Sequence, residues 1–323
     1  MTQSLSSQVH PTVSVLIAAY NAAGFLERAV QSALLQSRSP LEVIIVDDGS
    51  TDDTVAVIHK LMSRDARIRL VTLRENGGPA AARNAGLTEV RGEWVAILDA
   101  DDAFVPERLE TLLRYALPVH ADVVVDNFCY YNAISGVTGP PVLGAGSGVS
   151  QISFAEFLAH ARPFTGEADW GLLKPLFRTE FLRQHRLRYP VESRHGEDFL
   201  LLAQAFLCGA CYLLVREPGY LYTGRSSNLS RSRLDYHAMY RHTHALLSDP
   251  RVRANPLWTA GVRERAKAVR RLAAVTDFER FQRQSDYHGM LQRICQDPSF
   301  RLLVARKLLR LVLQPRGSRT APG

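Results

Sequence analysis

The first half of the chain alternates short apolar runs with segments of helical periodicity, and this alternation restricts the fold more than any other feature. Runs rich in Val, Ile and Leu cover residues 13–19, 41–46, 68–73, 94–98 and 123–128. Apolar residues recur at helical spacing within residues 24–36, 52–62, 79–90 and 106–117. Apolar strands joined by helices predict an α/β fold, with a mainly parallel sheet flanked by helices on both faces.

Polar clusters follow the predicted strands, at residues 19–21, 47–50, 74–79 and 99–102. Right-handed crossovers place these loops along one edge of the sheet, where ligands bind in open α/β folds. The last cluster holds Asp99, Asp101 and Asp102. Such carboxylates repel one another unless a cation neutralises them, which indicates a divalent ion holding a diphosphate. The alternative is a polar loop in which Asp102 caps a helix beginning near Pro106.

The pattern changes along the second half. Residues 136–150 are rich in Gly, Pro and Ser and predict a flexible loop. A helix is expected from Ser153, a further helix with an acidic first turn at residues 197–207, and a strand at 211–215. After about Arg225 strand patterns vanish and helical spacing continues. We therefore predict one α/β domain at residues 1–225 and a helical C-terminal extension at 226–323.

Charge and composition limit the class of protein. The net charge of +7 fits phosphate-bearing ligands or an anionic membrane surface, and is too modest to indicate nucleic acid. Residues 1–10 are polar, and no apolar stretch approaches the roughly 20 residues of a membrane span. Cys208 and Cys211 have CxxC spacing, but no second CxxC or nearby histidine pair completes a zinc site, so we expect reduced thiols and a cytoplasmic location.

Five motifs stand in order along the chain: VSVLIAAYN at residues 13–21, VDDGSTD at 46–52, NGGPAAARNAG at 76–86, LDADD at 98–102 and GED at 196–198. On these motifs the chain resembles the inverting family 2 glycosyltransferases with the GT-A fold, from residue 13 to about residue 225. The closest similarity is to bacterial exopolysaccharide enzymes of the succinoglycan type. The resemblance implies transfer of a sugar from a nucleotide-sugar, expected to be a UDP-sugar, to a hydroxyl of a glycan or lipid-linked oligosaccharide.

The first three motifs would bind the nucleotide. Tyr20 ends the first strand and could stack on a nucleobase, with Ala18 leaving room and Asn21 beside it. Asp48 could accept a hydrogen bond from N3–H of uracil. Arg83 could reach the ribose or diphosphate from the helix that begins at Pro79. The alternatives are a rim aromatic without a ligand for Tyr20 and a surface ion pair for Arg83.

The acidic motif would hold the donor and a metal. The resemblance assigns Asp99 to the ribose or donor sugar and Asp101 to Mn²⁺ or Mg²⁺. The ion would bridge the diphosphate oxygens and stabilise the leaving nucleotide. No role is assigned to Asp102.

Glu197 and Asp198 would carry the catalysis. Asp198 is the predicted general base, which takes the proton from the acceptor hydroxyl as that oxygen attacks the anomeric carbon. Glu197 would position the acceptor or the base. A helix N-terminus lowers the pKa of a carboxyl group, whereas burial and a nearby diphosphate raise it. The alternative is a pair of acids that only caps the helix.

Four further residues complete the predicted site. Trp170 could form a wall for the acceptor sugar, and Lys174 could offset charge near the diphosphate. A core Trp with a solvated Lys is the alternative for this pair. His195 lies beside the predicted base and could touch the acceptor or the metal. Arg225 belongs to a segment that resembles the family's closing loop and could reach the phosphates.

The C-terminal segment RLLVARKLLRLVL, at residues 301–313, places Arg306, Lys307 and Arg310 on one helical face. It is too short to span a bilayer but could lie on the inner face of the cell membrane as a peripheral contact, which would suit a lipid-linked acceptor. The alternative is a helix packed on the domain.

Three other functions can be compared with this sequence. A dinucleotide-dependent oxidoreductase would need GxGxxG after the first strand, where the chain reads Tyr20-Asn21-Ala22-Ala23-Gly24. A sugar-nucleotide pyrophosphorylase would need a Gly-rich basic loop at the same place. A non-catalytic nucleotide-sugar-binding protein is the remaining alternative, and the presence of both Asp101 and Asp198 disfavours it.

Overall fold

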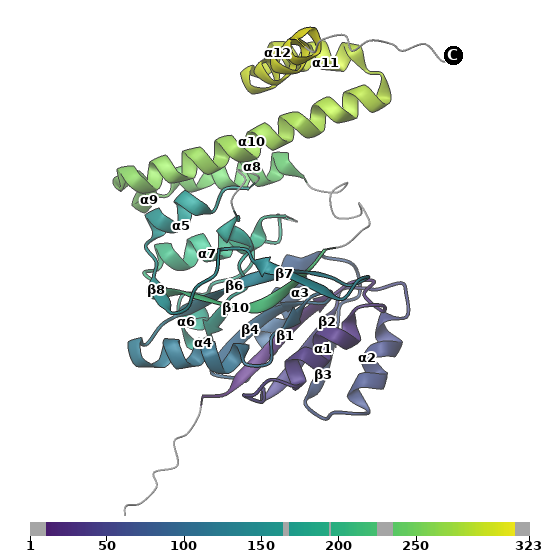
Figure 1. The fold of residues 1–323 in the computed structure, drawn as a ribbon, viewed down its shortest axis with the longest axis vertical. Coiled ribbons are helices and arrows are strands. Elements are labelled where there is room, and N and C mark those ends of the chain that lie inside the picture. The colour runs from purple at the N-terminus through teal and green to yellow at the C-terminus, as the bar shows by residue number, and fades with distance from the viewer. Residues whose placement is uncertain (1–10, 164–167, 194, 225–234, 314–323) are drawn as a thin grey trace, which may run out of the picture. The chain divides into compact units, whose positions relative to one another are not determined.

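One β-sheet organises the first part of the chain. The computed structural model describes residues 11–163, 168–193, 195–224 and 235–313. It divides into two units, residues 1–234 and 235–323 (Figure 1). The boundary predicted at residue 225 falls in a segment outside the described residues. Each unit is described separately below.

Four parallel strands form one half of the sheet in the order β3-β2-β1-β4. The strands are β1 (Val13–Ala19), β2 (Glu42–Asp47), β3 (Ile68–Thr72) and β4 (Trp94–Asp99). They are connected by α1 (Leu26–Leu34), α2 (Thr54–Met62) and α3 (Pro79–Glu89). The chain moves outward through α1 and α2 and returns through α3, so right-handed connections place α3 on the opposite face. This half confirms the predicted alternation.

Helix α3 lies unusually close to the sheet because its residues are small. A Cβ added at Gly86 would lie 2.1 Å from Cδ1 of Leu16 on β1 and 2.9 Å from Cγ2 of Val46 on β2. Ala80 and Ala82 are also buried. This close approach brings Arg83, on the same helix, to the edge of the sheet where β4 ends.

The other half of the sheet adds short antiparallel strand pairs to the mainly parallel sheet that was predicted. Strand β9 (Leu176–Arg178) runs antiparallel between β4 and β6 (Val123–Asn132). β6 pairs in parallel with β10 (Tyr212–Thr223), which also pairs with β5 (Ala103–Phe104). Because β9 runs opposite to β4, Lys174, which lies two residues before β9, is at the edge where β4 ends. The short β9 carries too little periodicity to be recognised from sequence.

The prediction of a flexible loop at residues 136–150 is wrong in part. It contains β7 (Val137–Pro141), paired with β6, and β8 (Val149–Gln151), paired with β10. Gly and Pro conceal these strands because both lie at sheet margins, where such residues are tolerated. Helices α4 (Arg108–Ala116), α5 (Phe154–His160), α6 (Thr179–Gln184) and α7 (Glu197–Leu207) and the short helices η1 (Leu117–Val119) and η2 (Trp170–Leu172) complete the unit.

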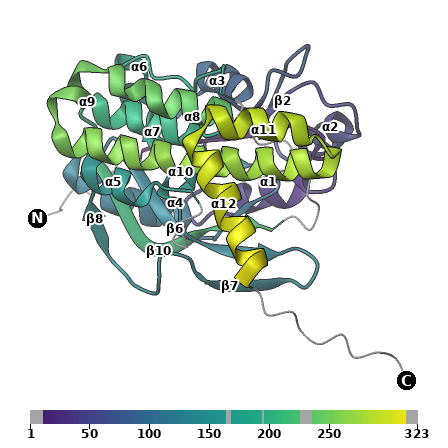
Figure 2. The same cartoon turned by 90° about the horizontal axis from the view of Figure 1, so that it is seen from above.

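The second unit is helical in its described part, as predicted. It comprises α8 (Tyr236–Ala245), η3 (Leu246–Ser248), α9 (Pro250–Ala254), α10 (Pro256–Gln284), α11 (Tyr287–Gln296) and α12 (Pro298–Leu313). Figure 2 shows α8 running beside the long α10. Phe300 and Val304 of α12 are buried in a cluster with Phe278 and Phe281 of α10, so α12 packs within the second unit. Within the described ranges, no helix is long and apolar enough to cross a membrane.

Candidate active site

The loops that follow β2 and β3 are joined through Asp48. The backbone N–H groups of Gly77 and Gly78 donate to its two carboxylate oxygens, each at 2.8 Å. Gly78 has a φ of 85°, a conformation that glycine adopts without a steric penalty, and it begins α3. The carboxylate is buried and holds the glycine loop in place. Contact between Asp48 and uracil stays a prediction, and it would use the further lone pairs of these oxygens.

The loop after β1 meets the same edge. Tyr20 is exposed there, as stacking on a nucleobase requires, and Ala18 is half-buried in β1. The side-chain oxygen of Asn21 accepts a hydrogen bond from the backbone N–H of Thr51 at 2.8 Å, and the backbone N–H of Asn21 donates to Oγ of Ser50 at 3.0 Å. Asn21 therefore connects the first two loops, and the predicted convergence of the loops on one edge is confirmed.

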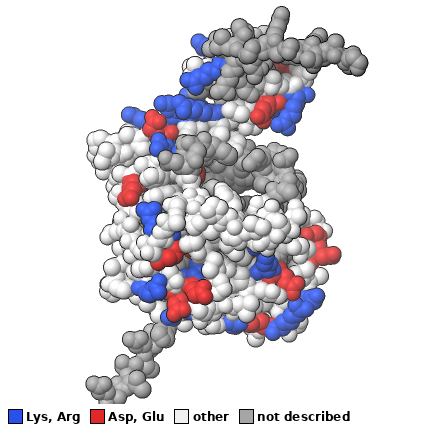
Figure 3. All heavy atoms as spheres, in the orientation of Figure 1, with Lys and Arg blue, Asp and Glu red and all other residues white. Residues whose placement is uncertain are grey.

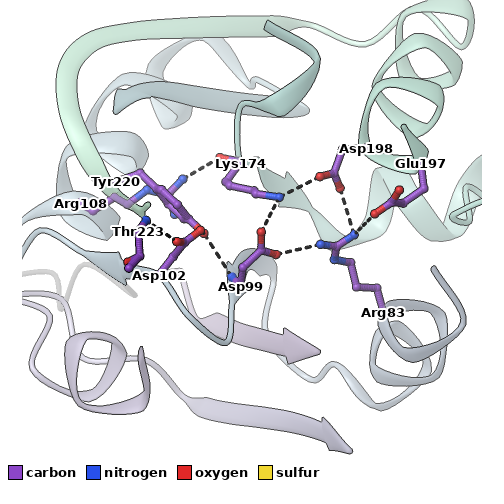
Figure 4. Close-up of polar contacts among 9 residues, drawn as sticks. All are labelled: Arg83, Asp99, Asp102, Arg108, Lys174, Glu197, Asp198, Tyr220 and Thr223. Atoms are coloured by element: carbon purple, nitrogen blue, oxygen red, sulfur yellow. Dashed lines mark hydrogen bonds and ion pairs between the residues drawn. The ribbon is translucent and has the colours of Figure 1, made fainter. Parts of the chain in front are cut away.

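Five predicted residues form one cluster of charges (Figure 4). The Arg83 guanidinium donates to Oδ1 of Asp99 at 2.8 Å, to Oε1 of Glu197 at 2.9 Å and to Oδ1 of Asp198 at 3.2 Å. Nζ of Lys174 lies 2.8 Å from Oδ2 of Asp99 and 2.8 Å from Oδ2 of Asp198. The residues come from α3, the end of β4, the segment before β9 and the first turn of α7. The fold thus joins side chains that lie up to 115 positions apart in the chain.

Charge balance decides how these groups titrate. Burial acts to lower the pKa of Arg83 and Lys174, but the surrounding carboxylates raise both well above their ordinary values. Burial acts to raise the pKa of Asp99, and Lys174 and Arg83 overcome it, so that pKa is held well below its usual range. Burial and the neighbouring Asp198 raise the pKa of Glu197. Three carboxylates face two cations here, so the cluster has a formal excess of one negative charge when all of its groups are ionised.

Asp102 is buried and binds β10. The hydroxyl of Tyr220 donates to its Oδ2 at 2.7 Å, and the backbone N–H of Thr223 donates to its Oδ1 at 2.7 Å. The same Tyr220 oxygen accepts from the backbone N–H of Asp99 at 3.2 Å. The N-cap residue of α4 is Glu107, so a helix-capping role for Asp102 is wrong. Burial and the two neighbouring acids raise the pKa of Asp102 well above its usual range.

Comparison with known proteins gives this arrangement a family. The family described as Glycosyl transferase family 2 matches residues 14–188. The chain belongs to glycosyl transferase family 2. The resemblance identified from the five motifs is thereby confirmed.

Two similar proteins come from Rhizobium meliloti (strain 1021). Succinoglycan biosynthesis protein ExoO is 36% identical over 227 residues, which cover 70% of this chain and 65% of ExoO. Succinoglycan biosynthesis protein ExoU is 34% identical over 264 residues, which cover 80% of this chain and 75% of ExoU. The match with this family 2 chain therefore spans about two thirds of the length of ExoO.

Solved structures share the fold. S. aureus TarS (residues 1–349), in complex with UDP-GlcNAc, superposes with a TM-score of 0.60 at 23% identity, covering 74% of this chain and 67% of TarS 1–349. The mannosyltransferase PcManGT from Pyrobaculum calidifontis, in complex with GDP-Man and Mn²⁺, gives 0.58 at 19% identity and covers 94% and 81%. At these identities the likeness is one of fold, and it confirms the predicted GT-A class for this family 2 member.

The acidic motif at residues 98–102 fits a metal ion that binds together with a substrate. Among the described residues, no group of three or more His, Cys, Asp or Glu side chains forms a ready-made metal site. The carboxylates of Asp99 and Asp102 accept from protein donors, and Asp101 stays the ligand that the resemblance predicts. Its carbonyl oxygen accepts from Nη2 of Arg28 at 2.6 Å, which fixes the backbone of the motif. One carboxylate suffices for Mg²⁺, which is usually bound by one or two carboxylates together with substrate phosphates.

The remaining predicted residues lie as follows. Trp170, in η2, is buried, and the ring of His160 stacks on it at 4.4 Å between centroids, which is the packed arrangement rather than an exposed wall. An acceptor contact by Trp170 stays a prediction. His195 is half-buried just before α7, and its carbonyl oxygen accepts from Oγ of Ser193 at 2.8 Å. Arg225 lies outside the described residues.

The sequence did not indicate which residues hold the charge cluster in place. Nη2 of Arg108, fully buried at the start of α4, donates to the carbonyl of Lys174 at 2.6 Å, and its guanidinium pairs with Asp126 at 2.8 Å. The ring of Tyr189 lies 5.2 Å from the guanidinium carbon of Arg83. A single Arg at a helix start gives no sequence signal of this kind. Only the tertiary structure shows that Arg108 fixes the backbone that carries Lys174.

Proposed function

We propose that this chain is an inverting glycosyltransferase that moves a sugar from a nucleotide-sugar to a hydroxyl of a glycan or lipid-linked oligosaccharide in surface polysaccharide synthesis. The observation that carries the proposal is the cluster of Arg83, Asp99, Lys174, Glu197 and Asp198, which joins the predicted donor residues to the predicted base. The names of ExoO and ExoU support the role in polysaccharide synthesis. TarS, solved with UDP-GlcNAc, supports a UDP-sugar donor.

Asp198 acts as the general base in this proposal. The acceptor oxygen attacks the anomeric carbon, the bond from that carbon to the diphosphate oxygen breaks, and the electron pair leaves with the nucleotide. The acceptor proton moves to an oxygen of Asp198, in a single displacement that inverts the anomeric centre. Each oxygen of Asp198 accepts one hydrogen bond, from Arg83 or from Lys174, and keeps a lone pair for the proton. Glu197 shares Arg83 with Asp198 and positions the base.

Arg83 and Lys174 serve the leaving group. Both cations are buried and both bind Asp99, the residue predicted to contact the donor. Buried cations placed where negative charge develops stabilise a transition state more strongly than cations in water do. A bound diphosphate would compete with the carboxylates for these two side chains, and this competition would free Asp198 for the acceptor.

A divalent ion, Mn²⁺ or Mg²⁺, is part of the proposal. Asp101 would hold the ion, which supplies Lewis-acid stabilisation to the departing diphosphate when bound. Arg28 would keep Asp101 in position through the hydrogen bond to its carbonyl. The complex of PcManGT with GDP-Man and Mn²⁺ supports this choice of ions.

We further propose a cytoplasmic location with peripheral contact to the inner face of the cell membrane. The support is the basic face of the C-terminal segment together with Leu302, which is exposed on α12. The packing of Phe300 and Val304 on α10 leaves Leu302 and Arg306 exposed.

Turnover separates the enzyme from a non-catalytic binding protein. We would measure thermal shifts with UDP-, GDP- and dTDP-sugars in Mn²⁺, Mg²⁺ or EDTA, and nucleotide release for the donor that shifts the wild type most. Asp198→Asn should abolish transfer and spare the donor shift, whereas Asp101→Ala should weaken the donor and metal shifts together. Equal loss of donor binding in both variants would contradict the assigned roles. A donor shift without nucleotide release or transfer would favour the binding protein.

A further inference from the structure

Three aromatic side chains form a cluster beside the charge cluster: Phe128 and Tyr130 on β6 and Tyr222 on β10. The ring centroids lie 5.5 Å apart for Phe128 and Tyr130, 5.9 Å for Phe128 and Tyr222, and 5.9 Å for Tyr130 and Tyr222. Tyr222 is the register partner of Tyr130 in the parallel pair of β6 and β10, so both rings stand on the same face of the sheet. The two Tyr rings meet edge to face at 80°.

The aromatic cluster is buried at one end and exposed to solvent at the other. Phe128 is buried, Tyr222 is half-buried and Tyr130 is 53% exposed. Two tyrosines held by a buried phenylalanine on paired strands present a rigid aromatic surface, whereas a lone exposed side chain would sample many rotamers. Little conformational entropy would be lost when a ligand stacks on such a surface. The geometry is that of a preorganised binding surface.

Tyr222 connects this surface to the charge cluster. Burial raises the pKa of its phenol, and the charges of Lys174 and Asp99 act on that pKa as well, because these groups lie close to the phenol. Lys174 in turn contacts Asp198, the proposed base. The next residue along β10, Thr223, donates to Asp102 and fixes the strand at this point. A ligand stacked on the two tyrosines would therefore lie near the groups that perform the transfer.

The stretch of chain that carries Phe128 and Tyr130 holds no charged side chain, and the cations nearby are already bound: Lys174 pairs with Asp99 and Asp198, and Arg28 donates to the carbonyl of Asp101. The sequence contains no Lys, Arg, Asp or Glu between Asp126 and Glu156, the stretch that forms most of β6 and all of β7 and β8. Figure 3 shows few charged side chains on the surface over β6 and β10. A phosphate or an acidic sugar would find no cation in this stretch. An uncharged ring with an apolar face fits it, since aromatic rings pack well on C–H groups and phenol hydroxyls bond to nearby polar groups.

We propose that Tyr130 and Tyr222 form an acceptor subsite, which binds the apolar face of an uncharged pyranose ring and directs its hydroxyl toward Asp198. The subsite rests on the proposed glycosyl transfer for its purpose. It also makes a claim about binding alone, which can be tested without turnover.

The test compares the wild type with Tyr130→Ala, Tyr130→Phe and Tyr287→Ala. Tyr287 lies on α11 and is 67% exposed, so it controls for the loss of an exposed tyrosine elsewhere. Binding is measured by saturation-transfer NMR with a panel of methyl glycosides of glucose, galactose and N-acetylglucosamine. Transfer is then measured with the glycoside that binds most tightly and the preferred nucleotide-sugar.

We expect the ring protons of at least one glycoside to receive saturation from the wild type, Tyr130→Phe and Tyr287→Ala, and not from Tyr130→Ala. In transfer, Tyr130→Ala should raise the acceptor KM about tenfold with a smaller change in kcat, as the loss of one stacked ring implies. Tyr130→Phe should restore the KM, because the ring and not the hydroxyl carries the stacking.

The outcomes separate the subsite from the proposed function. Binding that depends on Tyr130 without any sugar transfer would support the subsite and overturn the function. Transfer with an acceptor KM unchanged in Tyr130→Ala would overturn the subsite and leave the function in place. A wild type that saturates none of the glycosides, or a Tyr130→Ala variant that binds them as the wild type does, would also overturn the subsite.

Discussion

Lys174→Met removes one of the two cations of the charge cluster and tests the largest energetic claim made for it. Nζ of Lys174 lies 2.8 Å from a carboxylate oxygen of Asp99 and 2.8 Å from one of Asp198. At an effective dielectric constant of about 20, each attraction amounts to about 6 kcal/mol before the cost of desolvation is subtracted. Lys174 is 5% exposed, and removing one partner from a buried ion pair costs roughly 3–5 kcal/mol net.

The lower end of that range applies, because the Asp99 side chain is 22% exposed and Arg83 remains beside both acids. We expect Lys174→Met to lower the free energy of unfolding by about 3 kcal/mol, and the melting temperature by roughly 6–12 °C for a unit of this size. Urea unfolding at about pH 7 measures the first and calorimetry the second. The donor shift should fall as well, because Lys174 is proposed to bind the diphosphate.

The loss of stability should depend on pH in a stated direction. Burial raises the pKa of Asp99, but Lys174 and Arg83 hold it well below its usual range. A carboxyl group whose pKa is lower in the folded than in the unfolded state stabilises the protein above about pH 4. This stabilisation is lost as the pH falls through the pKa of the folded state. Without Lys174 the pKa of Asp99 rises. The stability difference between the wild type and Lys174→Met should therefore shrink as the pH falls below about 4.

Lys60→Met is the matched control, since Lys60 is exposed on α2 and the substitution should change stability by less than about 0.5 kcal/mol. If Lys174→Met also stays within about 1 kcal/mol of the wild type and keeps its donor shift, the cluster does not hold together as described. A stability difference that grows toward acid pH would refute the electrostatic reasoning alone.

Two further predictions concern Asp102 and the C-terminal segment. Burial and the neighbouring acids raise the pKa of Asp102, and a raised carboxyl pKa stabilises the fold below about pH 4 and loses that effect as the pH rises. Asp102→Asn should therefore gain stability over the wild type at about pH 7, with the gap closing near pH 4; parallel urea profiles at the two pH values would contradict this. Replacing Arg306, Lys307 and Arg310 together by Gln should weaken co-sedimentation with anionic phospholipid vesicles about a hundredfold, at roughly 1 kcal/mol for each positive charge removed. Unchanged sedimentation would remove the membrane contact from the proposal and leave the transfer chemistry untouched.

The sequence by itself determined the parts of this protein that depend on local periodicity. Apolar runs and helical spacing gave β1 to β4 and α1 to α3, because strand and helix patterns are properties of neighbouring residues. The strands' order along the chain then placed the polar loops on one edge. The motifs supplied Arg83, Asp99 and Asp198 through the family resemblance.

Only the tertiary structure decided which of these side chains contact one another. The antiparallel β9 brings Lys174 to the edge of the sheet, yet a strand of three residues has no period to read. Asp48 binds the glycine loop and Asp102 binds β10, although both stand in acidic motifs that suggested ligand contacts. Tyr130 and Tyr222 meet through the pairing of two strands that lie far apart in the chain. Contacts between distant residues depend on the packing of the whole unit, and no local pattern of residues records them.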